Sequence, residues 1–136
     1  MLLHPYISFN GNAEEALNFY RDVFDGKIFM LNRYDKAPFP TEEKEKNKIL
    51  HARLSFDGNV IMISDAMKER EVYASTNIQM SLQIEDADKM NAVFLKLSEG
   101  GTVLMPIAEQ FWGSKFGMLK DKFGIDWLLN CELKKQ

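Results

Sequence analysis

The segments AEEALNFYRDVF at residues 13–24 and ADKMNAVFLKLS at residues 87–98 decide the fold. In both, apolar residues recur at i, i+3, i+4 and i+7, the spacing typical of the buried stripe of an amphipathic helix. The two stripes are Ala16, Phe19, Tyr20, Val23 and, 74 positions later, Met90, Val93, Phe94, Leu97. A glycine follows three residues after each stripe. The sequence therefore predicts two equivalent helices and an internal repeat.

Strand-like segments surround both helices in the same order. A stretch of alternating apolar and polar residues precedes each helix, at residues 6–10 and 79–84. The segments that follow are 27–34, 49–56 and 60–64 in the first half, and 102–107, 116–120 and 125–131 in the second. Asp57-Gly58 is a strong hairpin signal. The sequence of each half therefore predicts the order β-α-β-β-β. We expect an α+β fold of two βαβββ modules, at about residues 1–66 and 78–133, which together form one domain over 1–136.

Composition narrows the class of protein. Of the 136 residues 46% are hydrophobic and 27% are charged, which is typical of a globular domain. The formal net charge of -3 gives no basic field for nucleic acid, and no stretch approaches the roughly 20 apolar residues that span a bilayer. The start of the chain lacks a signal-peptide pattern, so we expect a cytoplasmic protein without nucleic-acid or membrane partners. Cys131 is the one cysteine, which excludes an internal disulfide.

Strand alternation sorts the side chains of each predicted sheet into a face that packs on the helix and a face that does not. We expect the second face to be polar and concave in both modules, and the two faces to form one small-molecule pocket. Its predicted residues are His4, Tyr6 and Ser8 from the first strand, Ile49, His51, Arg53 and Ser55 from 49–56, and Gln79, Ser81 and Gln83 from the fifth strand.

Each candidate residue also has a structural interpretation. His51 is either a pocket residue or a hydrogen-bonded strand histidine. Arg53 is either a planar donor for a carboxylate or phosphate, or an exposed strand arginine. Asp65 ends a strand and is either a turn or N-cap residue, or an acid that reaches over the pocket rim. Trp112 is either an aromatic wall of the pocket or part of the core.

The segment DKAPFPTEEKEKNK at residues 35–48 has two prolines and many charges, which indicates an exposed loop. Its length exceeds that of a usual connection and is compatible with a mobile lid or with disorder. Phe39, between the two prolines, is the apolar residue that could close over a ligand.

Three stretches carry a family resemblance: HPYISFNGNAEEALNFYRDVFDGKI at 4–28, ILHARLSFDGNVIMISDA at 49–66 and EQFWGSKFGMLKDKFGIDWLLNCE at 109–132. In order and spacing they resemble the PhnB-like branch of the vicinal oxygen chelate superfamily, which includes glyoxalase I, extradiol dioxygenases and bleomycin-resistance proteins. The resemblance implies paired βαβββ modules and a homodimer. Some members of the branch carry a name as ubiquinone-pathway methyltransferases, but this sequence has no glycine-rich cofactor loop of a doubly wound sheet.

The resemblance also implies where a metal would bind. Metal-using members carry His and Glu ligands at strand positions that fall here on His4 or Pro5, on Gln79 and on Leu128. Leucine has no donor atom and an amide is a poor transition-metal ligand, so we expect no metal site of the usual kind. His4, His51 and Asp65 remain as an unconventional set.

Three functions are compatible with the sequence, which identifies no cofactor. The first is a pocket protein that binds or acts on a small polar or anionic metabolite through Tyr6, His51, Arg53, Asp65, Gln79 and Trp112. The second is a divalent-metal-dependent lyase, isomerase or dioxygenase of the superfamily. The third is a protein that sequesters a cationic drug, as bleomycin-binding relatives do.

Overall fold

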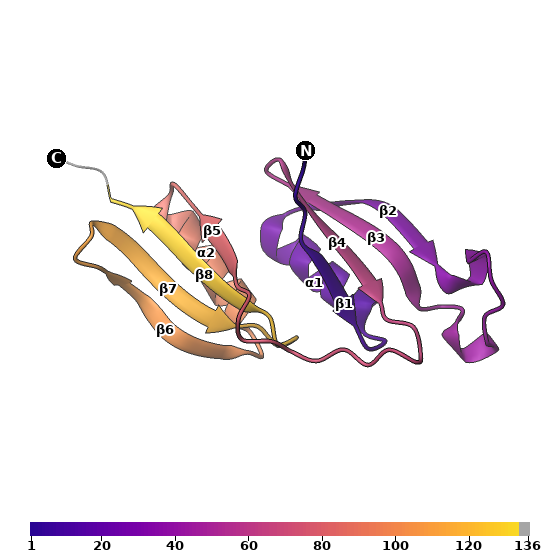
Figure 1. The fold of residues 1–136 in the computed structure, drawn as a ribbon. Helices are drawn as coiled ribbons and strands as arrows, with labels where there is room; N and C mark the ends of the chain where they lie inside the picture. Colours follow the sequence, from indigo (N-terminus) through magenta and orange to yellow (C-terminus); the bar gives the residue numbers. More distant parts are fainter. Residues whose placement is uncertain (134–136) are drawn as a thin grey trace. The chain divides into compact units, whose positions relative to one another are not determined.

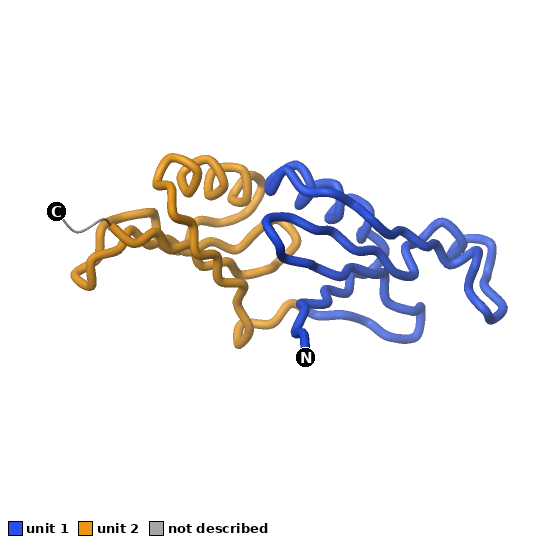
Figure 2. The backbone as a smooth tube through the Cα atoms, turned by 90° about the horizontal axis from the view of Figure 1, so that it is seen from above, with its two compact units in different colours: residues 1–73 blue, residues 74–136 orange. Residues whose placement is uncertain are grey.

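The computed structural model describes residues 1–133 of the chain, which divides into two compact units, Met1–Tyr73 and Ala74–Gln136 (Figure 2). Each unit holds one α-helix against one four-stranded sheet (Figure 1). We describe each unit by itself. Within the described residues no helix is both long enough and apolar enough to span a membrane.

The first unit follows the predicted β-α-β-β-β order. Its elements are β1 (Tyr6–Phe9), α1 (Ala13–Phe24), β2 (Lys27–Arg33), β3 (Ile49–Phe56) and β4 (Asn59–Asp65). The sheet order is β1-β4-β3-β2, with β1 parallel to β4 and the other pairs antiparallel. Two short 3₁₀ helices, Tyr34–Lys36 and Glu43–Glu45, lie between β2 and β3. The loop predicted at 35–48 therefore has regular turns of its own.

The second unit repeats that topology. Its elements are β5 (Met80–Gln83), α2 (Ala87–Ser98), β6 (Thr102–Glu109), β7 (Ser114–Lys120) and β8 (Asp126–Glu132). The sheet order is β5-β8-β7-β6, again with one parallel pair, β5 with β8. Both helices have the predicted bounds. The prediction of two βαβββ modules is confirmed.

One face of each sheet packs on its helix to form the core. In the first unit Leu17 and Tyr20 of α1 and Leu54 and Ile63 of the sheet are fully buried. In the second unit the predicted stripe of α2 is buried, and Trp127 and Leu129 of β8 are buried with it. Because buried aliphatic and aromatic side chains each contribute about 1.5–3 kcal/mol, these two cores account for much of the stability of the units.

A β-bulge corrects one predicted orientation. We expected Ile49 on the face away from α1, but its side chain is fully buried. The register explains this, because Asn32 pairs with His51 and Arg33 pairs with Ile49, which leaves Leu50 as the extra residue. An inserted residue reverses the alternation on one side of the bulge, so Ile49 enters the core while His51 keeps its predicted face.

Candidate functional site

The candidate site lies on the sheet face of the first unit that is opposite α1, which we call the free face of unit 1. Tyr6 on β1 and Arg53 on β3 both pair with Met62 on β4, so the three side chains form one row across the sheet. His51 lies two residues from Arg53 on the same face. The tyrosine hydroxyl is 2.8 Å from His51 Nδ1, and Arg53 Nε donates to His51 Nε2 at 3.0 Å.

This chain of contacts sets the protonation of the histidine. The Arg53 Nε–H group can only donate, so His51 Nε2 must carry a lone pair, and a neutral imidazole then has its proton on Nδ1. The pKa of His51 lies below its usual value because burial and, second, the charge of Arg53 disfavour the imidazolium. Nδ1–H therefore donates to the Tyr6 oxygen. The hydroxyl proton of Tyr6 is left to point away from the histidine.

Two kinds of donor remain available to a ligand. Arg53 uses only Nε within the protein, and its two terminal amino groups have no hydrogen-bond or ion-pair partner among residues 1–133. Tyr6 is 48% exposed, so its hydroxyl is accessible. Met62 and Met30 flank the guanidinium on the neighbouring strands and add apolar contact surface. The arrangement can bind a planar anion that carries an apolar group.

Asp65 does not join this group. Its carboxylate is 2% exposed and accepts backbone N–H bonds from Gly11 and Ala13 through Oδ1, and from Ile49 through Oδ2, each at 2.9 Å. The carboxylate thus caps the start of α1, where the side chain of Asn12 makes no cap bond. The expectation that Asp65 reaches over a pocket rim is corrected, and its alternative interpretation as a capping residue is the one the structure shows.

The sequence motif Phe9-Asn10-Gly11 has a structural role that sequence reasoning did not assign. The Asn10 side chain bonds the backbone of Val72 twice, donating to its carbonyl at 2.7 Å and accepting from its N–H at 2.9 Å. Ala66 N donates to the Phe9 carbonyl at 2.7 Å. The motif therefore holds the segment that follows β4 against the start of α1, a contact between residues too far apart in sequence for local patterns to reveal.

The remaining predicted site residues belong to the second unit. Gln79 is exposed and precedes β5. Trp112 is 51% exposed and contacts Phe116 edge-on at 5.8 Å between ring centroids, so its interpretation as core is wrong. The structure does not relate either residue to the Tyr6, His51 and Arg53 group.

The free face of the second unit, the sheet face opposite α2, also differs from expectation. Two rows of paired residues cross it: Ser81, Leu128, Met118 and Met105 in one, and Gln83, Asn130, Phe116 and Ala108 in the other. Most of the side chains beside the polar residues of β5 in these rows are therefore apolar. Gln83 of β5 is already hydrogen-bonded to Asn130 at 2.8 Å. The prediction of a polar free face is corrected for this unit.

The residues at the implied metal positions do not fit a site of the superfamily's usual type. Leu128 offers no donor atom, and Gln79 offers only an amide. The unconventional set fails as well, because both ring nitrogens of His51 and both carboxylate oxygens of Asp65 are already hydrogen-bonded. Among residues 1–133 no three His, Cys, Asp or Glu side chains gather in a group that could hold a metal ion.

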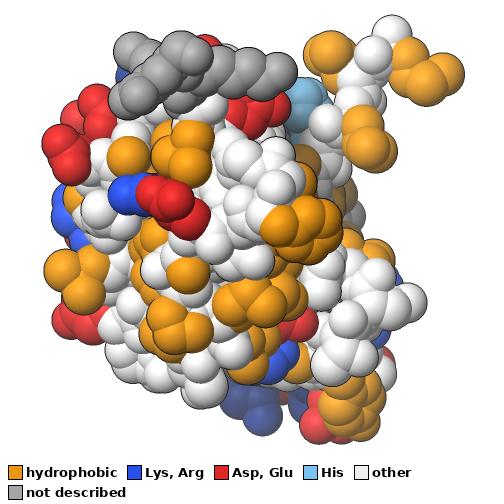
Figure 3. All heavy atoms as spheres, turned by 90° about the vertical axis from the view of Figure 1, so that its left-hand side faces the viewer, with side chains coloured by type: hydrophobic (Ala, Val, Ile, Leu, Met, Phe, Trp, Pro, Cys, Tyr) orange, Lys and Arg blue, Asp and Glu red, His pale blue; other side chains and the backbone are white. Residues whose placement is uncertain are grey.

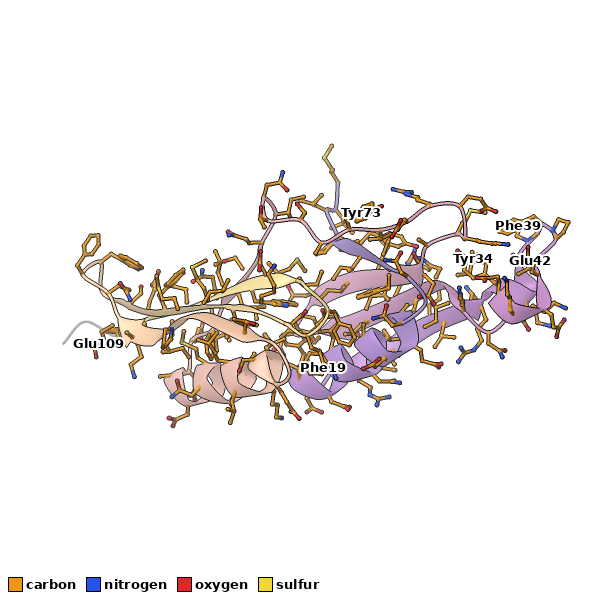
Figure 4. The ribbon with its side chains drawn as sticks, turned by 90° about the horizontal axis from the view of Figure 1, so that it is seen from below. Phe19, Tyr34, Phe39, Glu42, Tyr73 and Glu109 are labelled. Carbon is orange, nitrogen blue, oxygen red and sulfur yellow. The ribbon has the colours of Figure 1, made fainter. Side chains whose placement is uncertain are left out.

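The segment 34–48 encloses a second feature, a hollow that sequence reasoning missed. Phe39 packs edge-on against Tyr34 with ring centroids 6.4 Å apart, and Glu42 forms an ion pair with Lys68 at 3.0 Å. Figure 4 shows Tyr34, Phe39 and Glu42 close together at one end of the unit. The hollow between residues 34–45 and 66–69 has an open volume of about 520 Å³. We call it the loop hollow.

Comparisons with known proteins agree with this fold. The family model of 3-demethylubiquinone-9 3-methyltransferase matches residues 2–130. Protein PA1353 of Pseudomonas aeruginosa is 33% identical, with a TM-score of 0.89 over 98% of this chain and 99% of that one. The putative 3-demethylubiquinone-9 3-methyltransferase, PhnB protein, of Bacillus cereus is 29% identical, with a TM-score of 0.81 over 96% and 99%. A glyoxylase/bleomycin resistance protein/dioxygenase domain of Frankia sp. shares the fold, with 12% identity and a TM-score of 0.72 over 100% and 94%.

Proposed function

This chain belongs to the 3-demethylubiquinone-9 3-methyltransferase family, the PhnB-like branch of the vicinal oxygen chelate superfamily, and from this premise we propose that its first unit binds a small organic anion. The binding groups are the terminal nitrogens of Arg53 and the hydroxyl of Tyr6. His51 is a positioning residue that orients both. We call these three residues the anion site.

The observation that carries the proposal is the unneutralised guanidinium. No carboxylate of the described residues pairs with Arg53, while Asp65, one of the predicted pocket residues, is bound to backbone N–H groups. A guanidinium with two free amino groups matches the geometry of a carboxylate. The hydrogen bond from Arg53 to a neutral His51 fixes the plane of the guanidinium, so less side-chain entropy is lost when an anion binds.

The residues support the anion site better than they support methyl transfer. A glycine-rich loop between a strand and a helix would be needed to hold a nucleotide-type cofactor on a doubly wound sheet. Here β1 and α1 are joined by Asn10, Gly11 and Asn12, and the Gly11 N–H is already bonded to Asp65. We therefore derive no step through such a cofactor. The homodimer and the cytoplasmic location remain predictions.

Binding of phenylacetate, followed by ¹H–¹⁵N NMR on the full chain, tests the proposal. We expect shifts at Tyr6, His51 and Arg53. Arg53→Met should weaken binding about 10- to 100-fold, because a hydrogen bond to a charged group contributes about 1.5–3 kcal/mol. Arg53→Lys should recover part of this loss, since it keeps the charge without the planar pair of donors. Tyr6→Phe should weaken binding roughly 3- to 10-fold.

Arg21→Met is the matched control, because Arg21 lies on α1 and pairs with Asp22 at the surface. It should bind phenylacetate as the unmodified chain does. If Arg53→Met binds as tightly as the control variant, or if the shifts lie outside the free face of unit 1, the proposed function is wrong.

A further inference from the structure

We propose that the loop hollow is a second binding site, which accepts a small organic cation with an apolar body, such as an arylalkylammonium ion. This site is separate from the anion site and does not depend on it. The two take ligands of opposite charge, so the failure of one proposal is distinguishable from the failure of the other.

The walls of the loop hollow are held in place from both sides. Residues 34–48 are tied by backbone bonds from Tyr34 N to Lys48 O at 3.0 Å and from Asp35 N to Lys46 O at 3.1 Å. The opposite wall, residues 66–69, is tied by the Ala66 bond to Phe9 and by a turn from Arg70 N to Met67 O at 2.9 Å. Because both walls are fixed, a ligand would not have to order them.

The floor of the loop hollow is apolar and partly aromatic. Tyr34 and Phe39 line it together with Met67. The Tyr34 hydroxyl donates to the Asp65 carbonyl at 2.7 Å, so it is not available to a ligand. Phe39 is 39% exposed and Met67 is 51% exposed, which leaves both free to contact a ligand. Aromatic rings attract a cation placed over their faces, and a thioether packs well against an aromatic ligand.

The charge of the lining decides the class of ligand. Three carboxylates, Glu42, Glu45 and Glu69, and one ammonium group, Lys68, line the loop hollow. Glu42 pairs with Lys68 at 3.0 Å and with Lys44 at 3.7 Å, and Glu45 pairs with Lys48 at 2.6 Å. Glu69 makes no hydrogen bond or salt bridge among residues 1–133, its charge acts on the neighbouring Lys68, and its side chain is exposed at the hollow. An ammonium group can therefore pair with Glu69 while its apolar body lies on Phe39.

The size of the loop hollow limits the ligand. The space of about 520 Å³ includes space that is open to solvent, and the cavity itself has a volume of about 150 Å³, below the usual range of roughly 300–1,000 Å³ for small-molecule sites. A ligand with a single aromatic ring therefore fits better than a larger one. We therefore name 2-phenylethylammonium as the probe, and phenylacetate as its matched anionic counterpart.

Titration of the ¹⁵N-labelled full chain with 2-phenylethylammonium tests the proposal. We expect amide shifts in residues 34–45 and 66–69, with phenylacetate producing none there at the same concentration. Phe39→Ala and Glu69→Gln should each weaken the binding of the ammonium probe at least threefold. Glu71→Gln serves as the control, because Glu71 lies outside the hollow and bonds to the Tyr73 hydroxyl at 2.8 Å.

Three results would overturn the inference: ammonium shifts that fall outside both segments, equal binding of phenylacetate in the loop hollow, or unchanged affinity in both Phe39→Ala and Glu69→Gln. Since Phe39 and Glu69 are partly or fully exposed, neither substitution should unfold the chain. Retained amide dispersion in the spectrum of each variant checks this directly.

Discussion

Replacing Asp65 by asparagine should destabilise the first unit while leaving the shape of the side chain almost unchanged. The carboxylate accepts two N–H bonds through Oδ1 and one through Oδ2. An amide can present its oxygen to Gly11 and Ala13, but its NH₂ group then faces the N–H of Ile49. A buried donor left without an acceptor costs about 1–3 kcal/mol. The two surviving bonds lose their charge assistance, so we expect a total loss of about 2–5 kcal/mol.

Urea unfolding followed by far-UV circular dichroism measures this loss. Both tryptophans, Trp112 and Trp127, belong to the second unit, so tryptophan fluorescence alone would not report on the first. Amide hydrogen exchange at Gly11, Ala13 and Ile49 supplies the local measurement and should accelerate in Asp65→Asn. Asp22→Asn is the control, because Asp22 is 72% exposed and its surface ion pair contributes at most about 1 kcal/mol.

The reasoning would be refuted if Asp65→Asn unfolded within about 0.5 kcal/mol of the unmodified chain with the same denaturant slope. It would also be refuted if exchange at the three amides stayed unchanged. Either result would mean that the three backbone N–H groups do not depend on the carboxylate, and that the start of α1 is fixed by other contacts.

Two further predictions concern His51 and Gly101. NMR titration should give His51 a pKa below 6.5, because burial and then the Arg53 charge disfavour its charged form, and Arg53→Met should raise that pKa. The chain has two histidines, so His4→Asn assigns the signals. An unchanged His51 pKa in Arg53→Met would contradict the contact between the two side chains. Since the folded pKa lies below the unfolded one, the stability that neutral His51 contributes is complete above pH 6.5 and is lost as the pH falls toward the folded pKa. Gly101→Ala should destabilise the second unit by about 1–3 kcal/mol or more, because a Cβ there would lie 2.3 Å from the Lys120 carbonyl oxygen, which is backbone and cannot move aside cheaply. Gly113→Ala, where a Cβ would have open space but φ is +88°, should lose only about 1–2 kcal/mol. Urea unfolding followed by tryptophan fluorescence measures both variants, and a loss in Gly101→Ala below that in Gly113→Ala would refute the steric argument.

Local patterns predicted the helices and hairpins because those elements are specified by nearby residues. Both helices have the predicted bounds, since the spacing i, i+3, i+4 and i+7 needs only about two turns of sequence context. The orientation of Ile49 failed because a bulge is set by pairing between β2 and β3, and neither strand shows it alone.

Strand alternation predicted one part of the candidate site, the face that its residues share. Alternation placed Tyr6, His51 and Arg53 on one face, and the structure brings them into hydrogen-bond contact. Alternation did not reveal that Met118 and Leu128 fill the corresponding face of the second unit, since each also suits a core position. The loop hollow could not be predicted, because it depends on contacts between residues 34–45 and 66–69 that have no periodic signal.

The hydrogen bonds of Asp65 help to explain why the positive charge of Arg53 in the anion site is unpaired. The sequence places one acid, at the end of β4, in the same sheet as Arg53, and a carboxylate there could have neutralised the guanidinium. The start of α1 leaves backbone N–H groups without helical partners, and Asp65 satisfies one of these, that of Ala13, together with the N–H groups of Gly11 and Ile49. Because burial without these bonds would be costly for a charged group, the carboxylate cannot turn to the opposite face without breaking three hydrogen bonds. Strand alternation, with Asp65 three residues after Met62, and the capping of α1 thus both leave Arg53 without a carboxylate partner among residues 1–133, and this is the charge to which we propose that an anion binds.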